Sequence, residues 1–195
     1  MKIAVFAAVP EEVGRMSHVV NFTGIGREQA TQAALNFLDR HRDEIFTVVN
    51  VGTVGAHTLP VGSLLSIREV TSAGRIFHPQ PMLLDHLSYP CTADLPSAIL
   101  YSSDSFVSPK VYCADHLKEI SGNADCFDME SSSLFSIMNH FRKPYVSFKI
   151  VSDHLDVDIE EWRRRVHTLS QNLADFMEKL FSEIGEKEPV EFLKA

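Results

Sequence analysis

The sequence predicts an α/β domain built on a mostly parallel β-sheet. Short, continuous apolar runs recur along the chain, as expected for strands that are buried on both faces. Segments with helical spacing of apolar residues separate these runs, and strands alternating with helices are typical of parallel sheets. The chain has 195 residues, of which 45% are apolar, so it can form one domain with a real core but not two ordinary ones.

The first predicted strand covers residues 2–8 and ends before Pro10, which suits the first turn of a helix. A turn at 23–26 then leads into a predicted helix at 27–40. Five further strands are expected, at 46–52, 63–70, 97–103, 126–128 and 145–153. Residues 71–96 are rich in Pro, His and Ser and predict a long loop, and long loops in compact domains are often functional.

The last helix has the clearest pattern. Its apolar residues follow one another at intervals of four, three, four, three and four positions: Trp162, Val166, Leu169, Leu173, Phe176 and Leu180. This spacing forms one stripe on a helix of about six turns, which we interpret as core packing. The charged tail at 186–195 is expected to be peripheral. Because the chain shows neither repeats nor a low-complexity linker, residues 1–195 are expected to form a single domain.

The charge pattern argues against a nucleic-acid partner. The formal net charge is −8, the sequence pI is about 5.5, and no basic stripe is visible. The densest basic run, at 163–165, lies beside Glu160 and Glu161 in a helical pattern. We interpret it as a solvated helix face.

The cysteines and the N-terminal segment indicate a reduced compartment. Cys91, Cys113 and Cys126 are odd in number and form no CxxC motif, so we expect neither a disulfide framework nor a zinc site. The N-terminal apolar run meets Pro10 too soon for a secretory signal or a membrane span. We therefore expect a cytoplasmic protein without a membrane partner.

Acidic residues follow the carboxyl ends of several predicted strands, which is where ligands bind in parallel sheets. Glu12 follows the first strand, Glu130 follows the strand at 126–128, and Asp153 ends the strand at 145–153. These acids come from distant parts of the chain but would meet at one edge of the sheet. Buried like charges must otherwise be paired or protonated, so their convergence indicates a functional site.

Each acid also has a structural interpretation when it is considered alone. Glu12 could favour the positive end of a helix, and Asp153 with Ser152 could cap the last helix. Asp128 is equally suited to capping the helix that begins near Glu130 and to contacting a ligand. The glycine-containing turn before the first helix lacks the third glycine of a dinucleotide fingerprint, and the histidines show no metal-ligand spacing. We therefore expect neither a cofactor nor a metal.

Six blocks of the sequence, in order, carry a resemblance to a known family: MKIAVFAAVPEEV, TGIGREQATQAA, VVNVGTVGAHTLPVGSLLSIREV, YSSDSFV, FDMESSSLF and KPYVSFKIVSDHLD. The chain resembles the purine nucleoside phosphorylase and nucleosidase superfamily, most closely its methylthioadenosine/S-adenosylhomocysteine nucleosidases. The resemblance implies a compact three-layer α/β/α fold with a central, mostly parallel mixed sheet. It also implies a homodimer that binds a small-molecule nucleoside without a cofactor.

The resemblance implies roles for five residues around the scissile bond. Glu12 would be the general base that activates the attacking water. Asp153, oriented by Ser152, would donate a proton to N7 of the purine. Glu130 would hold the ribose 2′- and 3′-hydroxyls, and Met129 would pack against the sugar. Such acid and base groups typically contribute ~10²–10⁴-fold each to the rate.

Four further residues are implied to bind substrate. Thr53 keeps the hydroxyl of the serine usual in the family. Phe106 would stack on the base, and Val107 would offer it backbone hydrogen bonds. Lys149 stands where the family has an arginine four residues before the aspartate, and it keeps the charge but lacks the guanidinium fork.

The chain also departs from the family pattern. The segments between 12 and 23 and between 70 and 100 are shorter, near the family's substrate rim and dimer surfaces. Asn50 stands where phosphorylases carry a phosphate-binding arginine, which favours hydrolysis. The implied substrate is a purine nucleoside of the methylthioadenosine, adenosylhomocysteine or futalosine type, and the implied context is methionine salvage.

Two alternatives stay open. One is a phosphate-dependent nucleoside phosphorylase, for which Arg27 would be the available cation. The other is a nucleoside-binding module without activity, against which the retention of Glu12, Glu130 and Asp153 together argues.

Overall fold

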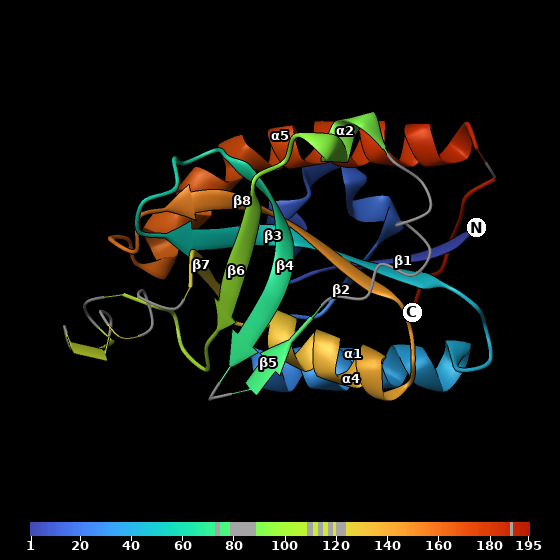
Figure 1. Ribbon diagram of the computed structural model, residues 1–195, viewed down its shortest axis with the longest axis horizontal. Helices are drawn as coiled ribbons and strands as arrows, with labels where there is room; N and C mark the ends of the chain where they lie inside the picture. Colours follow the sequence, from blue (N-terminus) through green and yellow to red (C-terminus); the bar gives the residue numbers. More distant parts are fainter. Residues whose placement is uncertain are drawn as a thin grey trace.

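The computed structural model describes residues 1–72, 75–78, 89–108, 111–112, 115–116, 119, 124–187 and 189–195. In this part of the chain a β-sheet lies between two layers of helices (Figure 1). The long helix α5 (Ile159–Gly185), with the short α2 (Pro90–Ala93) beside it, covers one side. Helices α1 (Arg27–His41) and α4 (Ser131–His140) cover the other. The three-layer α/β/α architecture is therefore confirmed.

The sheet is mixed. Its strands are β1 (Lys2–Ala7), β2 (Val20–Phe22), β3 (Thr47–Ala56), β4 (Leu64–Ser72), β5 (Arg75–Phe77), β6 (Ser97–Ser102), β7 (Cys126–Asp128), β8 (Tyr145–Asp153) and β9 (Glu191–Phe192). Strand β1 is parallel to β2, β3 and β9, strand β3 is parallel to β8, and β6 is parallel to β4 and β7. Strand β4 is antiparallel to β5 and β8, and the end of β3 is antiparallel to β7.

Five of the strands close into a ring. Backbone pairing links β3 to β8, β8 to β4, β4 to β6, β6 to β7, and β7 back to β3. All five strands contribute to one buried apolar cluster, which includes Val54, Leu65, Leu100 and Val151. Closure brings the carboxyl ends of β3, β7 and β8 together, and those ends carry candidate site residues.

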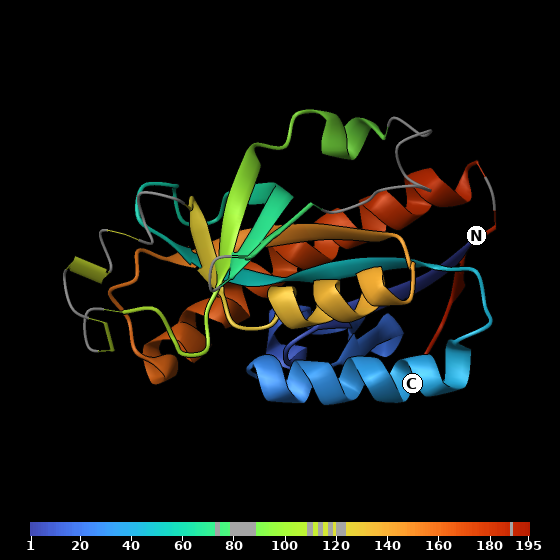
Figure 2. The ribbon, with the colours of Figure 1, turned by 60° about the horizontal axis from the view of Figure 1, so that its bottom comes forward.

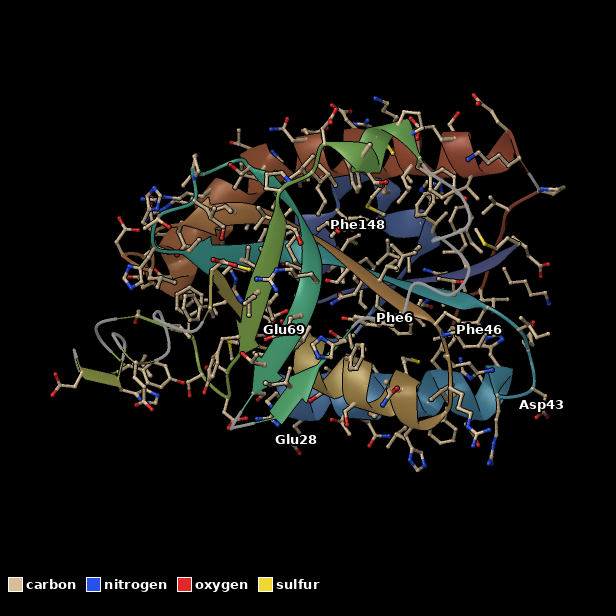
Figure 3. The ribbon with its side chains drawn as sticks, in the orientation of Figure 1. Phe6, Glu28, Asp43, Phe46, Glu69 and Phe148 are labelled. Carbon is tan, nitrogen blue, oxygen red and sulfur yellow. The ribbon has the colours of Figure 1, made fainter. Side chains whose placement is uncertain are left out.

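The two faces of the sheet fill two separate cores, because successive side chains of a strand point to opposite faces. In β1, Val5 belongs to the core under α5, whereas Phe6 belongs to the core under α1 and α4. Figure 3 shows Phe148 on the α5 side of the sheet and Phe6 and Phe46 on the other side.

Helix α5 begins at a polar cap and presents the predicted apolar stripe. The N-cap residue Asp158 accepts a hydrogen bond from the backbone N–H of Glu161 at 3.0 Å. Asp153 and Ser152 therefore do not cap this helix. All six residues of the stripe are buried, which confirms core packing: Trp162, Val166, Leu169, Leu173, Phe176 and Leu180. Two arginines of the basic run pair with Glu161 on the helix surface, as expected for a solvated face.

Three segments differ from the expectations. Strand β3 continues four residues past 52 to Ala56, because it stays paired with β8. The expected loop at 71–96 contains the end of β4, strand β5 and helix α2, while 73–74 and 79–88 lie outside the described residues. The tail expected to be peripheral instead adds β9 to the edge of β1 and buries Leu193. Both chain ends consequently lie at the same end of the molecule (Figure 2).

Cys91 and Cys126 are free thiols, and Cys113 lies outside the described residues. Burial raises the pKa of Cys91 to about 12, which keeps that thiol protonated at neutral pH. Among the described helices, none combines the length and the apolar composition needed to cross a membrane.

Candidate active site

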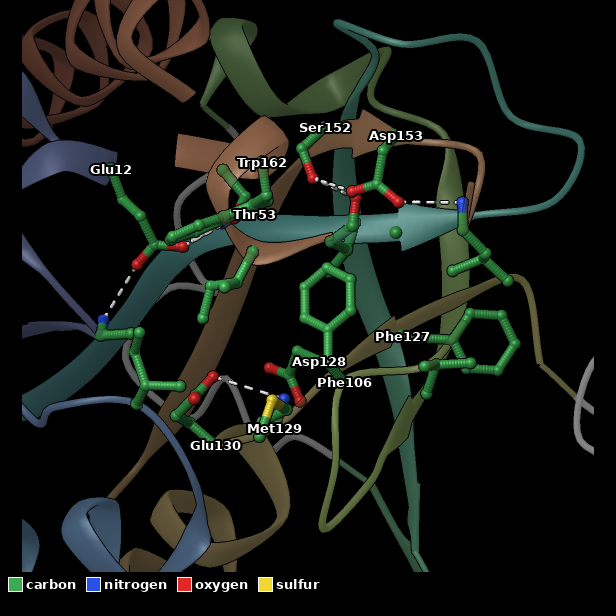
Figure 4. A pocket seen from close by; sticks show the side chains of 17 residues that line it. Glu12, Thr53, Phe106, Phe127, Asp128, Met129, Glu130, Ser152, Asp153 and Trp162 are labelled. Atoms are coloured by element: carbon green, nitrogen blue, oxygen red, sulfur yellow. Dashed lines mark hydrogen bonds between the residues drawn. The ribbon is translucent and has the colours of Figure 1, made fainter. Parts of the chain in front are cut away.

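One pocket gathers side chains from six separate segments of the chain (Figure 4). Its lining comes from 8–12, 25, 53–55, 106–107, 127–130 and 152–162, at the carboxyl ends of β1, β3, β7 and β8. Eight of the nine site residues proposed from the sequence line it: Glu12, Thr53, Phe106, Val107, Met129, Glu130, Ser152 and Asp153. The ninth, Lys149, does not.

Glu12 is fixed by hydrogen bonds at both carboxylate oxygens. It ends a single 3₁₀ turn, η1 (Pro10–Glu12), that follows β1. Its Oε2 accepts from the backbone N–H of Ala8 at 3.0 Å, and its Oε1 accepts from the backbone N–H and the hydroxyl of Thr53, both at 2.8 Å. A Cβ at Gly52 would lie only 3.0 Å from Oε1, so a glycine lets the strand come this close. The result is an oriented acceptor at the wall of the pocket.

Asp153 is fixed in a similar way at the end of β8 and is only 1% exposed. Its Oδ2 accepts from the Ser152 hydroxyl at 2.7 Å, and its Oδ1 accepts from the backbone N–H of Leu155 at 2.8 Å. Leu155 adopts the left-handed conformation, with φ of 65°, which turns its N–H toward the carboxylate. A Cβ at Gly55 would lie 2.5 Å from Leu155 Cδ2, so a larger residue there would displace the Leu155 side chain.

Glu130 immediately precedes α4 and is half-buried. Its Oε1 accepts from the backbone N–H of Gly26 at 2.6 Å, and its Oε2 accepts from that of Met129 at 3.3 Å. Burial, and then the nearby Asp128 carboxylate, raise the pKa of Glu130 to about 8, against an opposing contribution from the Gly26 N–H. Glu130 therefore titrates close to neutral pH.

We expect the raised pKa of Glu130 to make the free energy of unfolding fall as the pH rises from about 5 to about 8. The folded state holds this proton more tightly than the unfolded chain, where glutamate has a pKa of about 4.3. The stabilisation is thus complete at a pH below the pKa of the unfolded state, and it is lost as the pH rises through the pKa of the folded state. Urea unfolding of the wild type and of Glu130→Gln, at about pH 5, 7 and 9, checks this. With rising pH, the free energy of unfolding of the wild type should fall relative to that of the variant. If the difference between the two proteins does not change with pH, Glu130 does not have a raised pKa.

Asp128 lines the pocket and also accepts hydrogen bonds at the start of α4. Its carboxylate accepts from the backbone N–H of Ser131 at 3.3 Å and from the Ser131 hydroxyl. Lys149 Nζ lies 3.1 Å from Asp128 Oδ2, and the two side chains are 4% and 2% exposed. Burial alone lowers the pKa of Lys149, but Asp128 together with Tyr145, Glu12 and Glu130 more than offsets it, so the net pKa is raised. Lys149, expected to bind substrate, lies outside the pocket lining and is the buried counter-ion of Asp128.

Trp162 is a pocket residue that the sequence pattern assigned only to the core. It lies in the first turn of α5, lines the pocket, and donates its indole N–H to Thr53 Oγ1 at 3.0 Å. A buried tryptophan needs a partner for its N–H. Trp162 also lies only nine residues after Asp153. These two features are the signal in the sequence that could have identified Trp162 as a pocket residue.

The chemical character of the pocket is acidic and apolar. Its described lining contains four carboxylates and the apolar surfaces of Phe106, Met129 and Ile159, but no lysine, arginine or histidine. Within the described residues, no group of three His, Cys, Asp or Glu side chains could hold a metal ion. The site can therefore accept protons, donate them and hold neutral polar groups against apolar walls.

The fold and the pocket together define an α/β protein with an acid-lined pocket at the strand ends. The sequence profile of the Phosphorylase superfamily matches residues 6–183, so the chain belongs to this superfamily. No curated protein matches the sequence significantly.

Solved structures share the fold at low sequence identity. Futalosine hydrolase of Helicobacter pylori strain 26695 superposes with a TM-score of 0.78 at 15% identity, over 94% of this chain and 98% of that one. The methylthioadenosine/S-adenosylhomocysteine nucleosidase of Colwellia psychrerythraea 34H, in complex with adenine, gives 0.74 at 16%, over 94% and 95%. The corresponding Neisseria meningitidis nucleosidase, in complex with methylthio-immucillin-A, gives 0.75 at 16%, over 92% and 98%. The fold implied by the resemblance is thereby confirmed.

Proposed function

We propose that the protein is a nucleosidase that hydrolyses the N-glycosidic bond of a purine nucleoside and releases the free base and the ribose moiety. The observation that carries the proposal is the set of three carboxylates, Glu12, Glu130 and Asp153, that line one pocket. Cleavage of a nucleoside passes through a sugar with oxocarbenium character, which fixed anions stabilise. The pocket also offers the aromatic face of Phe106, on which a purine can stack.

Glu12 and Asp153 divide the acid–base work in this proposal. Glu12 takes a proton from the water that attacks the anomeric carbon, a role supported by its orientation as an acceptor at both oxygens. Asp153 protonates N7 of the purine, so that the base leaves without negative charge. The Ser152 hydroxyl, 2.7 Å from Asp153, orients the acid.

The remaining pocket residues bind the sugar and the base. Glu130 accepts hydrogen bonds from the two ribose hydroxyls, and Met129 covers the sugar with apolar surface. Thr53 presents its hydroxyl beside Glu12, and Val107 offers backbone groups to the base held by Phe106. The positions of all five in one pocket support these assignments.

Hydrolysis is favoured over phosphorolysis because the described pocket lining offers no cation for phosphate. Asn50 stands in the place of a phosphate-binding arginine, and its side-chain amide is already engaged in hydrogen bonds within the protein. Its amide donates to Ser131 Oγ at 2.9 Å and to Tyr145 Oη at 2.7 Å. Arg27, the other candidate cation, pairs with Asp104 at 2.7 Å.

The names of the structural relatives guide the choice of substrates. We include methylthioadenosine, adenosylhomocysteine and futalosine in the proposal because relatives of the same fold are named for acting on them. The proposal further includes a cytoplasmic homodimer in which the neighbouring subunit completes the 5′ end of the pocket, with methionine salvage as its context.

The function is tested by incubating the purified protein with a panel of purine nucleosides, with and without inorganic phosphate. The panel contains methylthioadenosine, adenosylhomocysteine, futalosine, adenosine and inosine. Released base and sugar are separated by chromatography. We expect free base and free ribose moiety at equal rates with and without phosphate.

Two results would overturn parts of the proposal. Base release that depends on phosphate and yields a sugar 1-phosphate would establish a phosphorylase instead. Binding of a nucleoside by calorimetry without any base release would establish a binding module without activity.

A further inference from the structure

Trp162 is connected to Glu12 through Thr53. The indole Nε1 lies 3.0 Å from Thr53 Oγ1, and the same hydroxyl oxygen lies 2.8 Å from Glu12 Oε1. The backbone N–H of Thr53 donates to that carboxylate oxygen as well, at 2.8 Å. The three residues are 8%, 7% and 4% exposed, and all of them line the pocket (Figure 4).

The chemistry of these groups fixes the direction of both hydrogen bonds. An indole N–H can only donate, so Thr53 Oγ1 is the acceptor in the first bond. The single proton of the hydroxyl is then available for the second bond, and an ionised carboxylate can only accept it. The indole therefore leaves the Thr53 hydroxyl with one role, which is to donate to Glu12.

The apolar cluster of Trp162 adjoins the segment that holds the other carboxylate oxygen of Glu12. Trp162 belongs to an apolar cluster with Val9 and Phe106. Val9 adjoins Ala8, whose backbone N–H donates to Glu12 Oε2 at 3.0 Å. One carboxylate oxygen is thus held by Thr53, which Trp162 bonds, and the other by Ala8, whose neighbour Val9 packs against the cluster of Trp162.

We propose that Trp162 is a positioning residue that acts through Thr53 to hold Glu12 in the orientation in which it accepts a proton. The inference rests on the proposed function, because it takes Glu12 as the general base. Misplacing a reacting group by a fraction of an ångström lowers the rate of the chemical step more than it weakens substrate binding. Loss of the indole N–H should therefore change kcat rather than KM.

Phenylalanine at 162 keeps an aromatic ring but removes the N–H. For Trp162→Phe we expect kcat to fall about 10- to 100-fold with KM within about threefold of the wild type. In a Thr53→Val background the same substitution should lower kcat by no more than about twofold further, because the group through which it acts is gone. The matched control is Phe176→Leu, on the same stripe of α5 and 6% exposed, which should lower stability and leave kcat unchanged.

A second measurement does not require turnover. The chain has one tryptophan, so a ¹⁵N-labelled sample gives a single indole N–H signal. We expect this signal to shift in Glu12→Gln and in Thr53→Val, and to exchange with solvent faster in Thr53→Val. In Phe176→Leu the signal should stay in place.

Several results would overturn the inference. They are a kcat for Trp162→Phe within about twofold of the wild type, equal losses of kcat in the wild-type and Thr53→Val backgrounds, or an indole signal that does not respond to Thr53→Val. These failures are distinguishable from failure of the proposed function. If the wild type releases no base from any nucleoside, the function is wrong, and the indole signal alone decides whether Trp162 positions Glu12.

Discussion

Replacing Asp153 by asparagine is expected to lower kcat for release of the purine by ~10²–10⁴-fold. The amide oxygen of asparagine can still accept from the Leu155 N–H, which lies 2.8 Å from the present carboxylate. Its NH₂ group can donate to Ser152 Oγ, whose proton then bonds the Val54 carbonyl at 3.2 Å. The pocket should therefore keep its shape, but an amide cannot transfer a proton to N7. Steady-state kinetics with the best substrate of the panel measure the effect.

The matched control is Asp156→Asn. Asp156 lies three residues further along the chain, is 61% exposed at its side chain and pairs with Arg165 at 3.7 Å on the surface. Its substitution should leave kcat unchanged. A kcat for Asp153→Asn close to the wild-type value would remove Asp153 from the acid role, and the leaving base would then need another proton donor.

The strands and the pocket could be predicted to different degrees. The strand at 126–128 and the strand at 145–153 were expected with the bounds that β7 and β8 have, because both segments are rich in apolar residues and end in acids. The end of β3 could not be predicted, because its glycine-containing segment extends only where β8 pairs alongside it. Local composition suggests a loop there, and pairing across the chain overrides it.

Candidate site residues could be selected because the carboxyl ends of parallel strands meet at one edge. That rule selects Glu12 and Asp153 without knowledge of their partners. It could not separate Asp128 from Glu130, since Asp128 ends β7 and Glu130 lies two residues further on. Their difference depends on Lys149, which is 21 positions from Asp128 in sequence and pairs with it only once β7 and β8 lie in the same sheet.

Long-range partners explain the other differences. Trp162 and Thr53 are 109 positions apart, and nothing in the spacing of the apolar stripe indicates that one indole points toward β3. The C-terminal tail reads as charged and solvent-exposed, yet its backbone pairs with β1 at the opposite end of the chain. The edge of a sheet presents unpaired backbone N–H and C=O groups, and an extended segment from elsewhere in the chain can pair with them.

Replacing Lys149 by methionine is expected to have the largest effect on stability. The Asp128 carboxylate would stay buried without its counter-ion, and breaking a buried pair on one side costs about 3–5 kcal/mol of the free energy of unfolding. Asp128 also accepts a hydrogen bond from Ser131, the residue that directly follows Glu130 at the start of α4. Nucleoside binding through Glu130 should therefore weaken in the same variant. Urea unfolding followed by circular dichroism measures the stability, and calorimetry measures the binding.

Two further variants separate the loss of charge from the loss of packing. In Asp128→Asn/Lys149→Met the neutral amide can still accept a hydrogen bond from the Ser131 N–H. Neutral groups of similar volume often replace a buried ion pair without loss of stability. Most of the stability lost in Lys149→Met should therefore return in the double variant. The surface control is Lys2→Met. Lys2 pairs with Glu44 at 2.5 Å, and its side chain is 37% exposed. This substitution should lower the free energy of unfolding far less than Lys149→Met does. If the double variant is as unstable as Lys149→Met alone, Lys149 stabilises the fold through the packing of its aliphatic stem, and Asp128 does not depend on its charge.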